Sequence, residues 1–128
     1  MKKIVVLVIA LLLITTSIFA QKKKENTAVK TKKVKVRYDK SRVIEALYYV
    51  QKSDKTIKEG NYKAFHPNKA VKEEGVYRNN KREGAWKSYN EKGDLLSEGD
   101  YVNGRYEGKW VFYHQNGVKS QEGTYQKG

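Results

Sequence analysis

The residues that could carry out acid–base or metal chemistry are few. His66 and His114 could act as proton donors or metal ligands, but each precedes a turn signal without the cysteines or spaced histidines of a zinc site. Asp100 and Glu107 are expected to face each other on neighbouring strands, and such a carboxylate pair could perform acid–base catalysis beside a bound substrate. Because the pair lies on an open sheet face where no pocket is predicted, the sequence does not indicate an active site there.

Nucleophilic and phosphate-binding motifs are also missing from the sequence. The chain has no cysteine, which removes thiolate catalysis, zinc–thiolate sites and disulfides. No G-x-S-x-G motif is present, and the Gly108–Lys109 pair falls inside a predicted strand and not in a phosphate-binding loop. We therefore predict that the protein is not an enzyme and that it has no catalytic residues, no cofactor and no metal.

A repeat determines the elements that must position these residues. The dipeptide Glu-Gly recurs in alternating steps of 15 and 9 residues, which sum to a period of 24. The segment 77–86 returns as 101–110, and Tyr125 begins a further copy. Such a period is typical of stacked arrays in which each repeat contacts only its neighbours. The dipeptides of the predicted array begin at Glu59, Glu74, Glu83, Glu98, Glu107 and Glu122.

Turn signals divide the chain into strand-like segments. Asn103-Gly104 and Asn116-Gly117 are the strongest signals, because both central residues of a type I′ hairpin turn need a positive φ. The segments between turns are rich in aromatic and β-branched residues, as strands are. We predict an all-β, single-layer antiparallel meander of hairpins with seven strands, at 45–52, 56–65, 70–78, 81–89, 94–102, 105–113 and 118–126. The first segment also fits one face of a short helix.

The predicted register depends on the lengths of the loops. Two-residue loops at 79–80 and 103–104, with four-residue loops at 66–69, 90–93 and 114–117, align six glycines in one row across the sheet. Glycine weakens a strand, so such a row implies that something approaches the backbone closely. We expect neighbouring Trp and Tyr rings to cover the row, in preference to a bound ligand. The row consists of Gly60, Gly75, Gly84, Gly99, Gly108 and Gly123.

The same register predicts an aromatic face beside the glycines. Its rings can form a core by shielding one another, and because a single-layer sheet has no second layer, they can also bind a partner chain. The protein could associate with itself through this face or through the open edge of the last strand, 118–126. The residues predicted for contact or core are Trp86, Trp110, Tyr101, Tyr106 and Phe112.

Acidic residues are predicted on the opposite face. Glu74, Glu98 and Glu122 fall in one row, beside a second row that contains Glu59 and Glu83. An ordinary solvated face with weak salt bridges accounts for this pattern. The alternative is a band that binds a cation, the basic segment of the same chain or a basic partner.

The first twenty residues resemble an export signal. Two lysines precede an apolar run of eleven residues, 4–14, and the small residue Ala20 precedes Gln21. The run is shorter than the roughly 20 apolar residues that span a bilayer, which favours cleavage near Ala20 over an uncleaved anchor. We predict a signal peptide at 1–20 and an exported protein, either periplasmic or secreted.

Most of the net charge of +13 lies before the repeats. Lys22 to Arg42 contains ten basic and two acidic residues, a net of +8, whereas from Glu59 onward twelve basic residues face ten acidic ones. Low apolar content predicts a disordered basic linker at 21–42, followed by the repeat domain at 43–128. The linker is expected either to contact an anionic envelope surface or to act as a soluble spacer. Export argues against nucleic acid as a partner.

The pattern Y-x-N-G-x-x-E-G-x-W, from Tyr101 to Trp110, resembles the MORN-repeat variant family. A tyrosine, an Asn-Gly turn and a second Glu-Gly follow it, and the resemblance covers residues 48–128. Lys69 and Asn80 depart from the pattern, because each replaces a turn glycine. The resemblance implies a meandering sheet of hairpins used as an interaction scaffold. Such chains are often described as YwqK-type antitoxin proteins, a label that accompanies the repeat and does not identify a site.

The function predicted from these features is that of an exported, non-enzymatic scaffold that binds a protein partner of unknown identity at the cell envelope. The alternative is an antitoxin-like protein that neutralises a toxin inside the cell by direct binding. The export signal is the feature that separates the two hypotheses.

Overall fold

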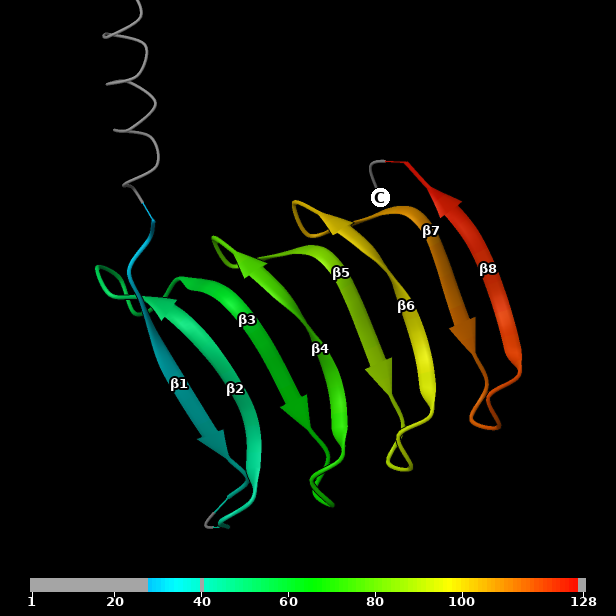
Figure 1. Cartoon of the computed structure of the whole chain (residues 1–128), viewed down its shortest axis with the longest axis horizontal. Coiled ribbons are helices and arrows are strands. Elements are labelled where there is room, and N and C mark those ends of the chain that lie inside the picture. The colour runs from blue at the N-terminus through cyan, green and yellow to red at the C-terminus, as the bar shows by residue number, and fades with distance from the viewer. Residues whose placement is uncertain (1–27, 40, 127–128) are drawn as a thin grey trace, which may run out of the picture.

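The computed structural model describes residues 28–39 and 41–126. Eight strands pair in chain order to form one open antiparallel sheet, and Figure 1 shows them side by side in a single layer. The all-β meander of hairpins is therefore confirmed, with one strand more than the sequence predicts. The strands are β1 (Thr31–Arg37), β2 (Ile44–Gln51), β3 (Lys58–Phe65), β4 (Val71–Arg78), β5 (Lys81–Tyr89), β6 (Leu95–Val102), β7 (Arg105–Tyr113) and β8 (Lys119–Tyr125).

The predicted signal peptide, 1–20, and the start of the predicted linker, 21–27, lie outside the described residues. Within the described ranges, no helix has the length and apolar composition needed to cross a bilayer.

The additional strand, β1, lies inside the segment predicted to be disordered, and for residues 31–37 that prediction is wrong. Val34 and Val36 are half-buried and alternate with exposed basic residues, so one face of the segment packs while the other stays in water. β2, where Ala46 and Val50 are buried, supplies the neighbouring strand that β1 pairs with. The charge count averaged over the segment conceals this alternation. β2 itself is a strand, which excludes the helical alternative.

The two-residue turns form as predicted. Asn79 and Asn80 have φ values of 48° and 64°, and Asn103 and Gly104 have values of 53° and 82°, as a type I′ turn requires. Asn80 replaces glycine here because its side-chain Oδ1 accepts a hydrogen bond of 2.7 Å from the backbone N–H of Lys58. These turns lie along one edge of the sheet, which is the upper edge in Figure 1.

The wider loops on the opposite edge are tighter than predicted. The first is closed by a hydrogen bond of 2.8 Å from His66 N to Ala70 O, so fewer residues lie in the loop. The shorter loop already displaces the register by one residue. An extra residue in β4, between the Phe65–Val71 and Ala64–Glu73 pairs, displaces it by one more. The loops after β5 and β7 close in the same way and are also followed by a register shift. These strand pairs are therefore displaced from the predicted register.

This displacement shows that the predicted glycine row is wrong. Gly60 is the register partner of Tyr77, Gly84 of Tyr101 and Gly108 of Tyr125. No two of the six glycines are register partners in the described sheet. The faces are preserved, because a shift of two residues returns each side chain to the same side of the sheet.

A second register irregularity, a bulge within β5 and β7, distinguishes the glycines that lie at a bulge from those that do not. Between the pairs Val76–Glu83 and Glu74–Lys87, β5 carries two extra residues, and Gly84 adopts a φ of +66° there. The same φ occurs at the equivalent glycine of β7. Glycine is favoured at these bulges because an L side chain rarely adopts this backbone conformation.

Candidate interaction surface

The bulge in β5 places the ring of Trp86 directly over Gly75 of β4. A Cβ atom built on Gly75 would lie 2.3 Å from the indole Cδ2, so no side chain larger than hydrogen fits beneath the ring. The indole Nε1–H donates a hydrogen bond of 3.1 Å to the carbonyl oxygen of Val76. We call this arrangement, a glycine under the ring with the next carbonyl as acceptor, an indole seat.

A second indole seat lies one repeat later. Trp110 of β7 covers Gly99 of β6, where an added Cβ would again lie 2.3 Å from the indole Cδ2. Its Nε1–H donates a hydrogen bond of 2.9 Å to the carbonyl oxygen of Asp100. The expectation that rings cover the glycines is thus confirmed at these two positions. Sequence reasoning missed the pairing itself, although the equal spacing of 11 residues from each of these glycines to its Trp was an available signal.

The rings form a continuous core within the single layer, which we call the aromatic spine. Trp86 and Trp110 are each 3% exposed and Tyr101 is 8% exposed, while Tyr106 and Phe112 are half-buried against them. Neighbouring rings meet mainly edge to face or stacked, which are the favourable geometries for aromatic pairs. The structure therefore brings all five predicted contact or core residues together. The spine consists of Tyr62, Tyr77, Trp86, Tyr101, Tyr106, Trp110, Phe112 and Tyr125.

Arg82 extends the spine with a charged group. Its guanidinium carbon lies 4.2 Å from the ring centroid of Trp86 and 5.3 Å from that of Tyr101. It donates hydrogen bonds of 2.9 Å to Glu73 and 3.0 Å to the Tyr101 hydroxyl. Burial opposes its charge, but hydrogen bonds to Tyr77 and Tyr101 and the Glu73 carboxylate raise the pKa of Arg82 above its usual value. The cation therefore stays charged and stabilises the stacked rings.

Carboxylates on the opposite face are engaged within the fold. Glu74 forms a salt bridge of 2.8 Å with Lys63 and accepts a hydrogen bond of 3.0 Å from the Tyr89 hydroxyl. The hydrogen bond from Lys63 is the main reason that the pKa of Glu74 is lowered. One repeat later, Glu98 pairs with Lys87 at 3.2 Å. In the described residues no group of three or more acidic or histidine side chains is placed to hold a metal ion.

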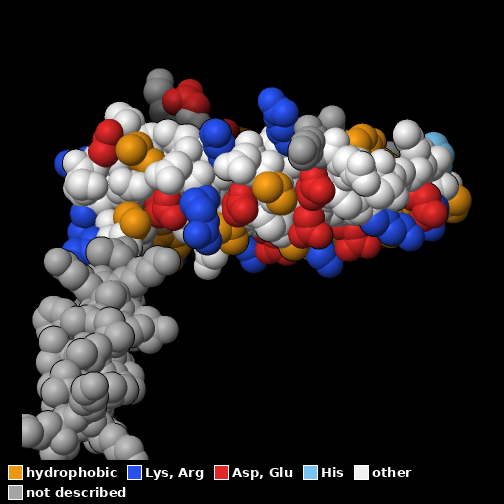
Figure 2. Space-filling view, turned by 90° about the horizontal axis from the view of Figure 1, so that it is seen from above, with side chains coloured by type: hydrophobic (Ala, Val, Ile, Leu, Met, Phe, Trp, Pro, Cys, Tyr) orange, Lys and Arg blue, Asp and Glu red, His pale blue; other side chains and the backbone are white. Residues whose placement is uncertain are grey.

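The first glutamate of the first two repeats supports a turn. Glu59 Oε2 accepts a hydrogen bond of 3.0 Å from the backbone N–H of Asn79, and Glu83 Oε2 accepts one of 2.9 Å from Asn103. Seen from above that turn edge, acidic and basic side chains are interspersed and hydrophobic side chains show only as small separate patches (Figure 2). This pattern is that of a solvated edge whose carboxylates bind the chain's own backbone.

The residues singled out for catalysis lie apart from one another. His66 is half-buried, with its ring Nε2 2.9 Å from the Tyr89 carbonyl oxygen, whereas His114 is exposed in the last wide loop. Asp100 and Glu107 are register partners, as predicted, on neighbouring strands of the sheet. These positions bring no histidine beside the carboxylate pair, and they do not define a reaction centre.

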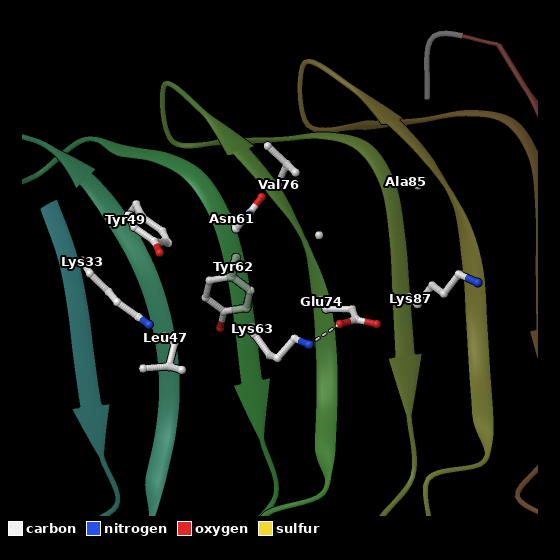
Figure 3. Close-up of a pocket in the computed structure, with 11 residues that line it drawn as sticks. Lys33, Leu47, Tyr49, Asn61, Tyr62, Lys63, Glu74, Val76, Ala85 and Lys87 are labelled. Atoms are coloured by element: carbon white, nitrogen blue, oxygen red, sulfur yellow. Dashed lines mark ion pairs between the residues drawn. The ribbon is translucent and has the colours of Figure 1, made fainter. Parts of the chain in front are cut away.

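A shallow, open groove of about 500 Å³ crosses the face that carries the lysine–glutamate pairs (Figure 3). Leu47 and Tyr49 of β2 line one side, and Lys63 points toward Glu74 in its centre. Among the described residues that line the groove, Glu74 is the only carboxylate. Because its pKa is lowered, it is ionised at neutral pH and poorly suited to act as a general acid.

These features define a repeat protein whose core is held within one layer of β-hairpins. The family model for the MORN repeat variant matches three consecutive segments, residues 58–79, 82–103 and 106–127. The chain therefore belongs to the MORN repeat variant family. Members of this family are generally non-enzymatic repeat modules, and the repeats suggest protein binding. No curated protein and no solved structure matches the chain.

Proposed function

We propose that the protein is an exported, non-enzymatic scaffold that binds a protein partner at the cell envelope. The observation that carries the proposal is that the aromatic spine stabilises the sheet while the outer strand edges remain for contact. The aromatic spine buries its own rings, so the array needs no second layer, and within residues 28–39 and 41–126 the outer strands of the sheet each have one side that another chain can pair with. An open groove without an acid–base set supports the non-enzymatic part of the proposal.

Burial of the aromatic spine limits which of its residues a partner protein can touch. Trp86, Trp110 and Tyr101 are at least 92% buried, so they contribute stability and little contact area to a partner. Tyr106 and Phe112 remain half-buried near the β8 end of the sheet. A partner, or a second copy in self-association, is therefore expected to use the strand edge with these two rings, and not the centre of the aromatic face.

The basic segment Lys22 to Arg42 is proposed to hold the scaffold near an anionic envelope surface. Its ordered part is β1, where Lys32, Lys35 and Arg37 are exposed. Clustered basic side chains on a strand present their charge at one end of the sheet, opposite the β8 edge.

The test of the function is fractionation of the native host with mass spectrometry of the protein's N-terminus. Recovery outside the cytoplasm with Gln21 as the first residue is expected. Recovery in the cytosol with Met1 intact would overturn the envelope location and favour the antitoxin-like alternative. Chemical cross-linking in the intact envelope, with the same chain expressed at native level, is expected to join the protein to a second polypeptide.

A further inference from the structure

The open groove on the face away from the aromatic spine carries more positive than negative charge. Three lysines line it, Lys33, Lys63 and Lys87, against the single carboxylate of Glu74, which Lys63 already neutralises. Lys87 is paired with Glu98 at 3.2 Å, whereas Lys33 has no ion-pair partner among the described residues. Figure 3 shows the Lys33 side chain extending from β1 toward β2, so an unpaired cation stands at this side of the groove.

The wall that β2 contributes to the groove is apolar where a carboxylate stands in the next pair of strands. Lys87 has two glutamates as register partners, Glu74 and Glu98, and is flanked by negative charge on both sides. Lys63 has Glu74 on one side but Leu47 on the other. The row of alternating charges on this face is therefore replaced at β2 by apolar surface, which lies beside lysines.

A second hollow of about 470 Å³, one repeat further along the same face, supplies a comparison. It is lined by two carboxylates, Glu98 and Asp100, and by Lys87, Lys109 and Lys119. Each of these lysines forms an ion pair with a glutamate. Charge complementarity therefore favours an anionic ligand in the groove beside Lys33 and not in the second hollow.

Asn61 adds a polar group that suits a polypeptide ligand. It lies within β3, although Asn is depleted in strands, and its exposed side chain bonds no other described residue. Its amide can donate one hydrogen bond and accept another. A peptide main chain presents an acceptor and, except at proline, a donor in each residue, so it can use both capacities.

A bilayer surface fits the groove less well than a peptide does. Protein faces that bind a bilayer insert exposed apolar side chains into it. The exposed large hydrophobic residues of the described chain are Val29, Val102 and Val118, and none of them lines the groove. Leu47 and Tyr49, which do line it, are half-buried within the sheet and can be covered by one side chain of a ligand.

We infer that the groove binds an extended acidic segment of the partner protein, in which an apolar side chain lies between two carboxylates. Alternate side chains of an extended chain point the same way, about 6.6 Å apart, so a Glu-x-Leu-x-Glu segment directs all three toward the groove. One carboxylate contacts Lys33, and the apolar side chain packs on Leu47 and Tyr49. The second carboxylate shares Lys63 with Glu74, because a lysine ammonium has three donors.

This inference rests on the proposed protein-binding function and specifies the chemistry of the partner. It gives the partner a contact on the face that the aromatic spine does not use. The half of this face that contains the groove therefore selects an acidic ligand, in contrast to the cation or basic partner that the glutamate rows suggest.

The test uses a labelled peptide that contains Glu-Ser-Leu-Ser-Glu, titrated with the full chain at an ionic strength of about 0.15 M and followed by fluorescence anisotropy. Saturable binding is expected. A peptide with Gln in place of both Glu residues should bind about tenfold more weakly, since two exposed ion pairs are lost. Lys33→Gln in the protein removes one of them and should weaken binding about threefold to fivefold.

Lys32→Gln is the matched control for Lys33→Gln. Lys32 is the preceding residue of β1, is also exposed and carries the same charge, but its side chain points to the other face of the sheet. Its charge is largely screened from the groove at this ionic strength, so peptide affinity should be unchanged. Equal losses in the two variants would overturn the proposal in favour of attraction by net charge.

Leu47→Glu tests the apolar wall. It places a carboxylate opposite Lys63, as Glu74 stands opposite Lys87, so the sheet should tolerate it, which circular dichroism would check. Peptide binding should weaken about tenfold or more, because the new carboxylate repels the ligand and removes the apolar contact. Val102→Glu makes the same replacement at an exposed position outside the groove and should leave binding unchanged. Native affinity in Leu47→Glu would overturn the proposal.

A lipid site would give a different result. If the peptide does not bind, while vesicles of anionic phospholipid bind more weakly to Lys33→Gln but not to Lys32→Gln, the groove is a lipid site and the proposal is overturned.

The failure of this inference can be separated from failure of the proposed function. If the peptide does not bind, while native chain and Leu47→Glu cross-link to the same envelope protein equally well, the acidic-segment groove is wrong and the scaffold function stands. If cross-linking finds no partner and the protein remains in the cytosol, the proposed function itself fails.

Discussion

Trp86 lies over Gly75 with its Nε1–H bonded to the next carbonyl, so the glycine and the indole form one packing unit that spans two strands. The ring covers the backbone of its neighbour where a second layer would stand in a sandwich. This relationship explains how a sheet of one layer can bury two indoles almost completely. The same relationship makes the stability of the array depend on glycines that no turn requires.

Gly75→Ala is expected to destabilise the protein by about 1–3 kcal/mol, the usual cost of forcing an extra carbon into a packed site. The added Cβ would meet ring carbons at 2.3 Å, and the indole must leave its seat to make room. Gly123→Ala is the matched control, expected within about 0.5 kcal/mol of the native chain because a Cβ added there would meet its nearest atoms, those of the Tyr125 ring, at an ordinary contact distance of 3.6 Å. Urea unfolding monitored by Trp fluorescence measures both. Equal effects of the two substitutions would contradict the indole seat.

Arg82→Lys is expected to cost about 1 kcal/mol although it conserves the charge. Lysine lacks the planar fork that lies over Trp86 while it bonds both Glu73 and Tyr101. A double-mutant cycle with Glu73→Gln, measured by urea unfolding, should give a coupling energy of at least about 0.5 kcal/mol.

The more exposed Lys63–Glu74 pair serves as the comparison for that cycle. Lys63→Gln combined with Glu74→Gln should give a coupling of about 0.5 kcal/mol or less, as is usual for surface ion pairs. A coupling as large as that of Arg82 and Glu73 would show that the aromatic environment does not strengthen the arginine pair.

Stability is expected to fall as the pH rises from about 10 to about 12. Burial, with the nearby Glu73 charge, raises the pKa of Tyr62 from 10.0 to about 12. Because the unfolded chain ionises this tyrosine first, the stabilisation is complete below pH 10 and is lost as the pH rises through the folded-state pKa. Urea unfolding at a series of pH values should show a shallower decline in Tyr62→Phe. An identical decline in both proteins would refute this assignment.

Binding to vesicles that contain anionic phospholipid is expected to depend on β1. Lys32→Gln combined with Lys35→Gln should weaken binding of the full chain by about 30-fold, since each surface lysine contributes about 1 kcal/mol. The control is Lys69→Gln combined with Lys92→Gln, which removes the same charge from exposed loops. Co-sedimentation at low salt measures both. Equal losses would indicate attraction by net charge alone, without a role for the basic strand.

Much of the fold could be predicted from local patterns. The Asn-Gly and Asn-Asn turns require positive φ, and their positions place β5 and β7 at the residues predicted. The alternation of Trp and Tyr with charged residues assigned the rings to one face, because the side-chain period of a strand is two. The aromatic residues proposed for contact or core were found from these two signals.

The prediction failed where extra residues enter a strand. Bulges at Gly84 and in β4 change which residues face each other, and their positions depend on backbone conformations that several residue types could adopt. β1 was missed for a related reason, since Val34 and Val36 form a strand only because β2 offers an apolar neighbour. A segment evaluated by its charge alone does not reveal that neighbour.

The sequence by itself determined the repeat, the turns and the two faces, because these depend on φ preferences and spacing within a few residues. Only the tertiary structure decided which glycine lies beneath which ring, and therefore that Trp86 and Trp110 are core and not contact surface. The physical reason is that the register of two paired strands depends on the length of the loop and of every bulge between them. One or two inserted residues therefore change all later pairings.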